Sequence, residues 1–259
     1  MIFLKSLTKK IFFLIKYILT VIRVYCSPSS KPYALKLYED TLPSAPREHI
    51  DAWSLYEKDE IINSYNHFKK YFSSSIFLFH KNQILEYAIK KALKNNYCEK
   101  KLYLEFGVYK GESVNFISKI IPNNLVYAFD SFQGLNKDWS GYYLEEGFFD
   151  LNQKLPKLNK NVIPVVGLIE DTLPSFLQEH GEEINFMHID TDIYESAKTI
   201  LTSTKNKLAK NSIIVFDEIY NFPGWSVGEY KALTEVYNEG EYKFLAFAKN
   251  GQQAVIQIL

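Results

Sequence analysis

The sequence predicts an α/β protein built around a doubly wound, mostly parallel sheet of seven strands. From Lys101 onward, short apolar runs alternate mostly with longer amphipathic or polar stretches. Buried strands of a parallel sheet read as continuous apolar runs, and helical patterns between them supply the right-handed crossovers. A chain of 259 residues, 47% apolar and 23% charged, is long enough to bury a sizeable core. We therefore predict one α/β domain over residues 99–259, preceded by two smaller regions.

The first region, residues 1–27, has the pattern of a very apolar helix with a narrow basic stripe. Lys5, Lys9, Lys16 and Arg23 fall within one sector of that helix, and no acidic residue occurs before Cys26. Lys16 and Arg23 interrupt the apolar core that a signal peptide or a membrane span requires. The pattern favours peripheral contact of residues 1–26 with a membrane surface, and it leaves open a helix packed on its own domain or on a second subunit.

The second region, residues 28–98, is predicted to be a helical cap that leads into the main domain. Pro28 and Pro32 end the first helix, and residues 73–96 show a helical period. No internal repeat or low-complexity segment occurs in the sequence.

Charge and cysteine content exclude several classes of protein. The formal net charge is zero, and the body beyond residue 26 is mildly acidic, which gives no reason to expect a nucleic acid partner. The two cysteines, Cys26 and Cys98, lack the spacing of a disulfide framework or a cysteine metal site. A reducing, cytoplasmic location is therefore expected, with the first helix at the inner face of the membrane.

Seven apolar runs define the expected strands of the main domain. In chain order they are "KLYLEFGV", "NLVYAFD", "NVIPVVG", "INFMHID", "SIIVFDE", "YKFLAFA" and "QAVIQIL". The last two are separated only by "KNGQ", whose Asn-Gly pair is favoured in tight hairpins, so the final strand should run antiparallel to its neighbour.

The ends of the first two of these strands carry a candidate nucleoside site. In "YLEFGVYKGES", Glu105 ends a strand, Gly107 permits a close backbone approach, and Gly111 opens a helix. Asp130 ends the next strand, 23 residues beyond Gly107, where an acid can accept both ribose hydroxyls. The G-x-G-x-x-G loop expected for a dinucleotide is absent, which favours S-adenosylmethionine over NAD.

Three further residues complete the predicted cofactor site. Ser131 follows Asp130 directly, and Asp171 and Thr172 in "GLIEDTLP" follow the third strand, near the expected place of an adenine edge. Asp171 or Thr172 could equally cap a helix, because both residue types are common before a Leu-Pro helix start.

Acidic residues gather at the ends of the next two strands. Asp190 and Asp192 follow the run "INFMHI", and Asp217 and Glu218 end "IIVFDE". Carboxylates at adjacent strand ends repel one another unless they are neutralised, and an all-oxygen set suits Mg²⁺ or Mn²⁺ rather than zinc. Asp190, Asp217 and Glu218 are the predicted metal ligands, whereas Asp192 is predicted to cap the following helix.

Six phrases in this order resemble the macrocin and mycinamicin sugar O-methyltransferase family, relatives of the metal-dependent catechol O-methyltransferases. They are "LEFGVYKGES", "YAFDSFQGL", "EDTLP", "MHIDTDIYESAKTIL", "IIVFDEI" and "GWSVGEYKAL", and they lie between Leu104 and Leu233. The resemblance implies a class I methyltransferase with a Rossmann-like sheet, methyl transfer from S-adenosylmethionine to a sugar hydroxyl, and a divalent metal. It implies a cofactor held by Glu105, Gly107, Gly111, Asp130 and Asp171, and a metal held by Asp190, Asp217 and Glu218.

The resemblance also makes Asp190 the expected general base. The lysine of the catechol enzymes, three positions after the first metal aspartate, is replaced by Ile193. His188 is an alternative base by its ordinary pKa, although a histidine in a buried strand is more often a satisfied core residue.

Two other expectations concern the acceptor and rival functions. The long connection after Asp130 is the predicted substrate wall, because its aromatic residues could stack on a sugar or anchor the loop: Trp139, Tyr142, Tyr143, Phe148 and Phe149. Trp225 could close over the metal site. The rival functions are a metal-dependent glycosyltransferase using the "DTD" triplet and a noncatalytic membrane-associated binding protein.

Overall fold

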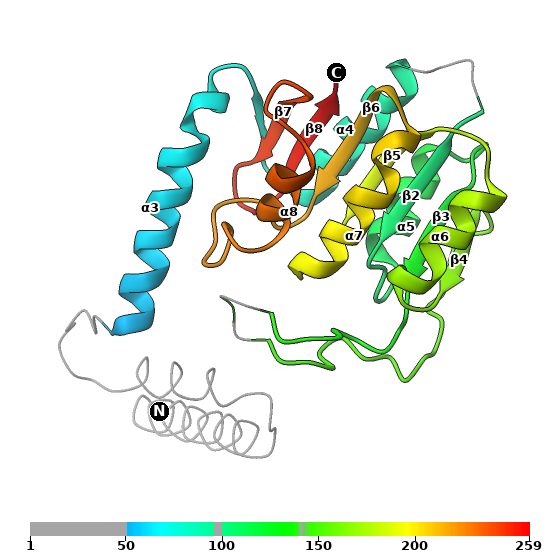
Figure 1. The fold of residues 1–259 in the computed structure, drawn as a ribbon, viewed down its shortest axis with the longest axis horizontal. Coiled ribbons are helices and arrows are strands. Elements are labelled where there is room, and N and C mark those ends of the chain that lie inside the picture. Colours follow the sequence, from blue (N-terminus) through cyan, green and yellow to red (C-terminus); the bar gives the residue numbers. More distant parts are fainter. Residues whose placement is uncertain (1–50, 96–99, 140–141, 143) are drawn as a thin grey trace, which may run out of the picture. The chain divides into compact units, whose positions relative to one another are not determined.

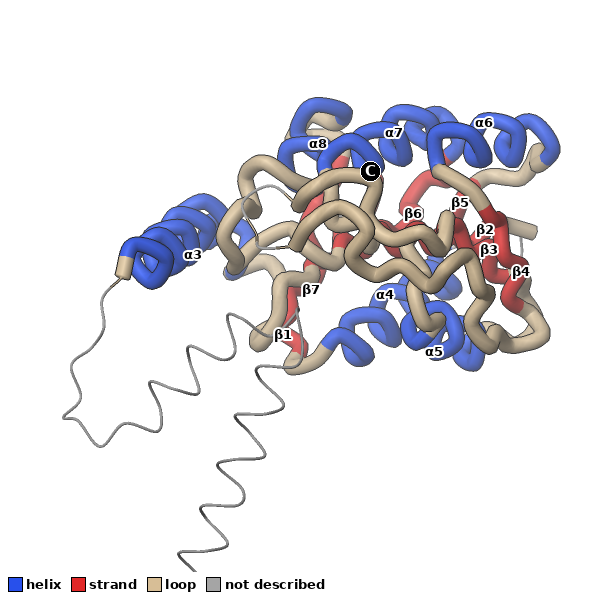
Figure 2. Tube along the Cα trace, turned by 90° about the horizontal axis from the view of Figure 1, so that it is seen from below, coloured by secondary structure: helices blue, strands red, loops and turns tan. Residues whose placement is uncertain are grey.

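The structure is a computed structural model that describes residues 51–95, 100–139, 142 and 144–259. The predicted helix of residues 1–27 lies outside these residues. The described part is a compact unit, Asp51–Leu259, built on an eight-stranded sheet. Figure 2 shows helices along both faces of that sheet, as a doubly wound fold requires. In the described ranges, no helix is long and apolar enough to cross a membrane.

The sheet contains all seven predicted strands and one more. Its order is β1-β7-β8-β6-β5-β2-β3-β4, and β8 runs antiparallel to both β6 and β7 while the other pairs are parallel (Figure 1). The strands are β1 (Ile76–Leu78), β2 (Leu102–Phe106), β3 (Val126–Asp130), β4 (Val162–Val166), β5 (Ile184–Ile189), β6 (Leu208–Phe216), β7 (Tyr242–Ala248) and β8 (Ala254–Ile258). The predicted fold class and the antiparallel end of the sheet are confirmed.

The additional strand, β1, comes from a segment whose pattern indicated a helix. Ile76 pairs with Ala246 of β7, so β1 extends the sheet at its antiparallel end. Its apolar run, residues 76–79, is short and lies within a longer helical pattern, and the side chains of the three strand residues are largely exposed. Residues 51–95, part of the predicted cap, thus contribute a strand to the sheet of the main domain and two helices to the same compact unit.

The helices cover the two faces of the sheet unequally. They are α3 (Ala52–Phe72), α4 (Lys81–Asn95), α5 (Glu112–Ile120), α6 (Ile169–Glu179), α7 (Tyr194–Thr204) and α8 (Glu229–Val236), with a short 3₁₀ turn, η2 (Lys205–Lys207). Helices α6, α7 and α8 lie along one face, and α4 and α5 lie along the other (Figure 2). The core therefore has two apolar layers, one on each face.

Strand β2 shows how the sequence builds these layers. All five of its residues are buried. Leu104 and Phe106 belong to the layer beneath α6, α7 and α8, whereas Tyr103 belongs to the layer with α4 and α5. Alternate residues of a strand point to opposite faces, so Glu105 shares the face of Tyr103. This buried carboxylate consequently meets Ser113 of α5, whose hydroxyl donates to Oε1 at 2.7 Å.

The parallel strands place their carboxyl ends at one edge of the sheet. In the register of β2 and β5, Glu105 lies opposite His188 and Phe106 opposite Ile189. In the next pair, Ile189 lies opposite Phe216 of β6. The residues that follow these strands, among them Gly107, Asp190 and Asp217, are therefore brought together.

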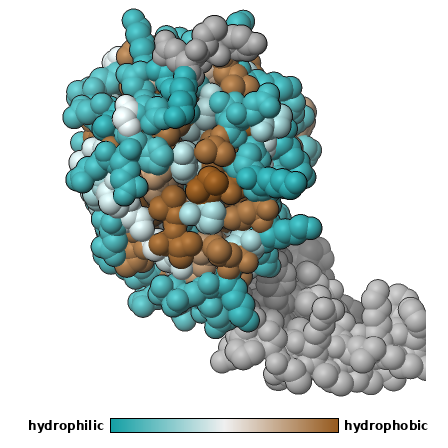
Figure 3. Space-filling view, turned by 90° about the vertical axis from the view of Figure 1, so that its right-hand side faces the viewer, coloured by the Kyte–Doolittle hydropathy of each residue, from teal (hydrophilic) through white to brown (hydrophobic). Residues whose placement is uncertain are grey.

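The far edge of the sheet, formed by β4, carries exposed apolar side chains. Figure 3 views the molecule from this side and shows a brown apolar area between polar margins. Ile163 and Val166 of β4 and the nearby Leu168 are each exposed over more than a third of their surface. This edge is the boundary of the fold on the side of β3 and β4.

Candidate active site

A cleft of about 340 Å³ opens at the carboxyl edge of the sheet. One wall is formed by residues that follow β2, β3 and β4, and the other by residues that follow β5 and β6. In open α/β sheets, ligands bind outside the carboxyl ends of the strands. The cleft therefore lies at the edge of the sheet where the sequence predicts both the cofactor site and the acidic residues.

Gly107 connects the two walls through its backbone. A Cβ atom at this position would lie 1.7 Å from the backbone oxygen of Asp190, and its φ of +84° is in the left-handed region. The N–H of Asp190 donates to the carbonyl of Phe106 at 2.9 Å, which fixes the two loops against each other. Only glycine fits this crossing, so the packing of the loops alone accounts for the residue.

Asp130 holds the loop after β2 in place. Its Oδ2 accepts the backbone N–H of Val108 at 2.7 Å and of Tyr109 at 2.8 Å, and its Oδ1 accepts the N–H of Phe132 at 2.6 Å. An ionised carboxylate has about four lone-pair sites, so these bonds leave roughly one for a ligand. Asp130 and the adjacent Ser131 both line the cleft.

Four other residues predicted to hold the cofactor are placed outside the cleft lining. Glu105 is fully buried beneath it, and Gly111 is the N-cap of α5. Asp171 and Thr172 lie in the first turns of α6, where the Thr172 hydroxyl donates to the Leu168 carbonyl at 2.9 Å. Residues 167–170 line the cleft instead. The structure thus brings Gly107, Asp130 and Ser131 to the cleft, and the contact roles of the other four stay predictions.

The acidic residues form two overlapping groups around Asp190. One group is His188, Asp190 and Asp217, and the other is Asp190, Asp192 and Glu218; in each, one ligand atom per residue lies within 4.8 Å of the others. Asp190, Asp192 and Glu218 line the cleft, whereas Asp217 does not. Among the residues that the structure describes, the predicted set Asp190, Asp217 and Glu218 is therefore divided between two groups.

Lys81, the first residue of α4, is a member of the site that sequence reasoning missed. Its Nζ donates to Oδ2 of Asp190 and contacts Oδ1 of Asp217, both at 2.8 Å. Burial lowers the pKa of Lys81, but the carboxylates of Asp190 and Asp217 outweigh burial and hold that pKa above its usual range. Because Asp190 lies 109 positions away along the chain, no local pattern could have indicated this contact.

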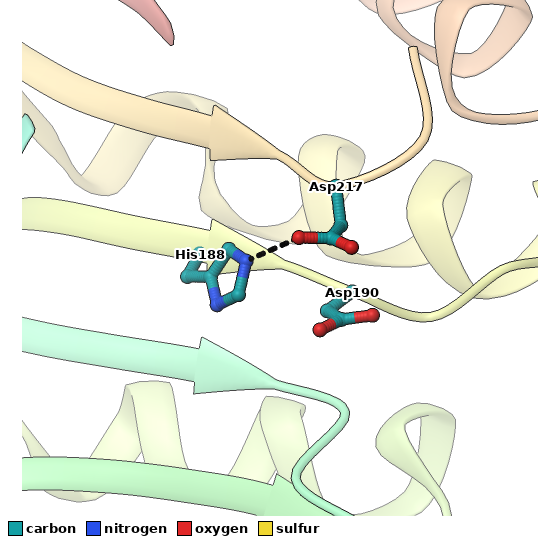
Figure 4. A group of neighbouring side chains, drawn as sticks. All are labelled: His188, Asp190 and Asp217. Atoms are coloured by element: carbon teal, nitrogen blue, oxygen red, sulfur yellow. Dashed lines mark hydrogen bonds and ion pairs between the residues drawn. The ribbon is translucent and has the colours of Figure 1, made fainter. Parts of the chain in front are cut away.

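His188 connects Asp217 to the buried Glu105. Its Nε2 lies 3.3 Å from Oδ1 of Asp217 (Figure 4), and its Nδ1 lies 3.3 Å from Oε2 of Glu105. Burial lowers the pKa of His188, but hydrogen bonding to Asp217 and Glu105 raises it to about 10. His188 is fully buried and does not line the cleft, so its position favours a role in the core over contact with an acceptor.

Asp192 does not cap the helix that follows it, contrary to expectation. The N-cap of α7 is Ile193, and no side chain caps this helix. Asp192 instead has a φ of +63° and belongs to a candidate metal group. Burial raises the pKa of its carboxyl well above the usual value, and Asp190 and Asp217 raise it further.

Glu218 is a buried carboxylate with one unpaired oxygen. Its Oε2 lacks a hydrogen-bond partner among the described residues, while its backbone N–H donates to Oε2 of Glu229 at 3.1 Å. Burial raises the pKa of Glu218 well above the usual value, with a further contribution from Asp217. Three cleft carboxylates, one with an orphaned oxygen, are a donor set that suits a divalent cation preferring oxygen ligands.

Some aromatic residues of the loop after β3 anchor the loop by being buried, and others are exposed. Trp139 is buried against Tyr142, with ring centroids 4.6 Å apart, and it lines the cleft together with Phe149. Phe148 is 43% exposed. Tyr143 lies outside the described residues. The loop is thus held by Trp139, and this same ring forms part of the cleft wall.

Trp225 does not line the cleft. It packs 5.2 Å from the ring of His67 and 5.5 Å from that of Tyr230. The expectation that it closes over the acidic residues is therefore wrong, because the indole anchors α8 to α3.

Comparison with known proteins identifies the domain that contains this cleft. Residues 104–219 match a protein-family model described as a methyltransferase domain. No curated protein matches the sequence of this chain.

Several solved structures share the fold. The calicheamicin methyltransferase CalS11 superimposes with a TM-score of 0.55 at 18% identity, over 89% of this chain and 93% of its own. The apo form of CalS11, a TDP-rhamnose 3'-O-methyltransferase, gives 0.50 at 19% identity, over 89% and 95%. The O-methyltransferase NovP gives 0.50 at 18% identity, over 69% and 79%.

The match runs from within β2 to just beyond β6, and it includes the cleft residues that follow β2 to β6. The enzyme class predicted from the sequence, an S-adenosylmethionine-dependent O-methyltransferase, is the class that this domain supports. Residues 104–219 match the model of a methyltransferase domain, and the fold of the described chain is that of class I methyltransferases.

Proposed function

We propose that this protein transfers a methyl group from S-adenosylmethionine to a hydroxyl of a sugar or glycan, with the help of a divalent cation. The observation that carries the proposal is the two-walled cleft, which places Gly107 and Asp130 opposite Asp190, Asp192 and Glu218 within a methyltransferase domain. CalS11, which is similar in fold, is a TDP-rhamnose 3'-O-methyltransferase, and this similarity supports a sugar as the acceptor.

On the first wall, Asp130 and Ser131 are the proposed contacts to the ribose of the cofactor. The remaining lone-pair site of the Asp130 carboxylate can accept one ribose hydroxyl without loss of its three backbone bonds. Gly107 brings backbone close to the sulfonium end, next to the acidic wall. This arrangement would orient the donor methyl group toward Asp190.

On the second wall, Asp190 is the proposed general base. Lys81 occupies its Oδ2, so Oδ1 is the oxygen available to accept a proton from the acceptor hydroxyl. The carboxylates around Asp190 would also hold Mg²⁺ or Mn²⁺. A bound divalent cation supplies positive charge that lowers the pKa of the acceptor hydroxyl. Trp139 and Phe149 limit the entry of water and offer apolar faces to a sugar ring.

A direct assay tests the proposal. The purified full-length chain is incubated with S-adenosylmethionine, Mg²⁺ and a panel of nucleotide sugars and lipid-linked sugars, and S-adenosylhomocysteine and the product mass are measured. We expect one added methyl group on a sugar hydroxyl. Cleavage of a nucleotide sugar without methyl transfer would instead identify the glycosyltransferase.

We also propose that residues 1–27 bind the cytoplasmic face of a membrane, on the basis of their basic stripe and apolar arc. In liposome sedimentation, replacing Lys5, Lys9, Lys16 and Arg23 with glutamine should weaken binding to anionic vesicles. Each basic residue contributes about 1 kcal/mol near such a surface. Loss of oligomeric state, with no effect on vesicle binding, would identify a packing helix.

A further inference from the structure

We propose that the acceptor sugar binds between the loop after β3 and the first turn of α7, where Asn136 and Ser196 bind its hydroxyl groups, and that this sugar ring carries no negative charge. The inference rests on the proposed function, because it gives the place and the charge class of the acceptor in the same cleft. Neither Asn136 nor Ser196 belongs to the predicted cofactor or metal residues.

An ion pair brings the loop after β3 to the start of α7. Nζ of Lys137 lies 2.7 Å from Oε1 of Glu195, 58 positions further along the chain. The neighbours of these two residues, Asn136 and Ser196, both line the cleft. Because Lys137 and Glu195 are in contact, the side chains of Asn136 and Ser196 flank the same part of the cleft.

The loop that carries Asn136 is held by its own backbone. The N–H of Leu135 donates to the carbonyl of Phe148 at 2.8 Å, and the N–H of Trp139 donates to the carbonyl of Leu144 at 3.0 Å. Asn136 lies between these two bonds. Its position at the cleft is therefore fixed by the loop and requires no contact from the Asn136 side chain.

The side chains of Asn136 and Ser196 have groups available for a ligand. Asn136 is exposed and Ser196 is half-buried, and neither side chain forms a hydrogen bond with another described residue. The asparagine amide and the serine hydroxyl can each donate and accept. A sugar hydroxyl also donates and accepts, so both side chains match it without bringing a charge.

The same two segments supply an apolar surface. Leu135 and Trp139 of the loop and Ile193, the N-cap of α7, line the cleft, and none is more than 8% exposed. Small-molecule sites combine apolar walls with a few polar groups that set orientation. A sugar ring fits this combination, because its C–H faces are apolar and its hydroxyls lie around the rim.

The charges of the cleft indicate which sugars fit. The acidic residues of its lining are Asp130, Glu170, Asp190, Asp192 and Glu218. Among the described residues, the lining contains one basic side chain, Lys81, whose Nζ lies 2.8 Å from carboxylate oxygens of Asp190 and Asp217. A divalent cation would offset only part of this negative charge. Sugar hydroxyls can donate to carboxylates, whereas a carboxylate or phosphate on the sugar ring would be repelled.

Matched glycosides test the charge class. Methyl α-D-glucopyranoside and methyl α-D-glucopyranosiduronate differ only at C6, and the corresponding galactosides form a second pair. Their binding to the full-length chain, saturated with S-adenosylhomocysteine and Mg²⁺, is titrated by saturation-transfer NMR. We expect the neutral member of at least one pair to bind more than about tenfold tighter than its uronate. Uronates that bind as tightly as the neutral glycosides, or neutral glycosides that do not bind, would overturn the proposal.

Asn136→Ala and Ser196→Ala test the two residues. Each should weaken binding of the neutral glycoside by about twofold to tenfold, as expected for one lost hydrogen bond. The affinity for S-adenosylhomocysteine and the melting temperature should not change. Asn123→Ala, an exposed change between α5 and β3 at the opposite edge of the sheet, is the matched control. Wild-type glycoside affinity in both cleft variants would contradict the proposal.

Asn136→Lys tests the charge class in the opposite direction. The new ammonium supplies a cation at the proposed sugar site, so this variant should bind the uronate at least as tightly as the neutral glycoside. A preference unchanged from wild type would show that Asn136 does not face the sugar.

The methyl-transfer assay separates this inference from the proposed function. If wild type binds neutral glycosides as expected but transfers no methyl group from S-adenosylmethionine to any sugar, the proposed function is wrong and the sugar site stands. If wild type methylates a sugar whose KM is unchanged in Asn136→Ala and Ser196→Ala, the proposed function stands and the sugar site is wrong.

Discussion

The two walls of the cleft are built by different means. The wall that follows β2, β3 and β4 depends on backbone: Gly107 crosses the Asp190 loop, and Asp130 is used mainly to hold N–H groups. The wall that follows β5 and β6 depends on charged side chains that are buried or half-buried, including Asp190, Asp217 and Lys81. A substitution that adds volume should therefore disturb the first wall most, whereas a substitution that removes a charge should disturb the second wall most. Each wall can be changed separately.

The largest effect is expected from Gly107→Ala, because the added Cβ would lie 1.7 Å from a backbone oxygen that cannot move independently. We expect a loss of more than about 4 kcal/mol in the free energy of unfolding, measured by urea denaturation. Gly147→Ala is the matched control. It has a similar φ of +80° but no atom within 4 Å of the new Cβ, so it should cost only the strain of about 1–2 kcal/mol. If both variants lost the same free energy of unfolding, the contact between Gly107 and the Asp190 backbone would not be tightly packed.

The next effect tests the charged wall through Asp190→Asn. Methyl transfer should fall by roughly 10²–10⁴-fold, as expected for loss of a general base. The affinity for S-adenosylmethionine, measured by calorimetry, should remain near wild type because the cofactor contacts lie on the other wall. Asp59→Asn, an exposed change on α3, is the control for loss of an acid. A parallel loss of cofactor affinity in Asp190→Asn would show that the walls do not act separately.

The same contrast explains what the sequence could predict. The strands of the parallel core are long apolar runs, and residues after adjacent strand ends meet at one edge by topology alone, so both the fold and the grouping around Asp190 follow from local patterns. Lys81 could not be found in this way, because its contact with Asp190 depends on where α4 begins relative to β5. The cap role of Asp192 was wrong because tertiary packing gave Asp192 a positive φ and left Ile193 as the N-cap.

A smaller effect is expected for cofactor binding from Asp130→Ala. Loss of a charged hydrogen bond to the ribose should weaken S-adenosylmethionine binding by about 1.5–3 kcal/mol. Asp130→Asn keeps one acceptor oxygen for the loop and should lie between wild type and Asp130→Ala. Unchanged affinity in Asp130→Ala, with normal stability, would remove Asp130 from the cofactor site.

The smallest effect concerns a pair of neighbouring acids in the first turn of α6. Glu170 and Asp171 occupy equivalent places relative to the helix dipole, so each should contribute about 0.3–1 kcal/mol to stability by that route. Only Glu170 lines the cleft. Because Glu170 and Asp171 should contribute equally to stability, a difference in cofactor affinity between their alanine variants reports on contact with the cofactor.

We expect Glu170→Ala to weaken S-adenosylmethionine binding by about 0.5–1.5 kcal/mol, the usual worth of one hydrogen bond. Asp171→Ala should leave the dissociation constant within about twofold, a difference of about 0.4 kcal/mol. Calorimetry on both variants measures this directly. If Asp171→Ala proves the more damaging, the sequence-based assignment of Asp171 to the adenine edge is right, and the first turn of α6 must present its other side to the bound cofactor.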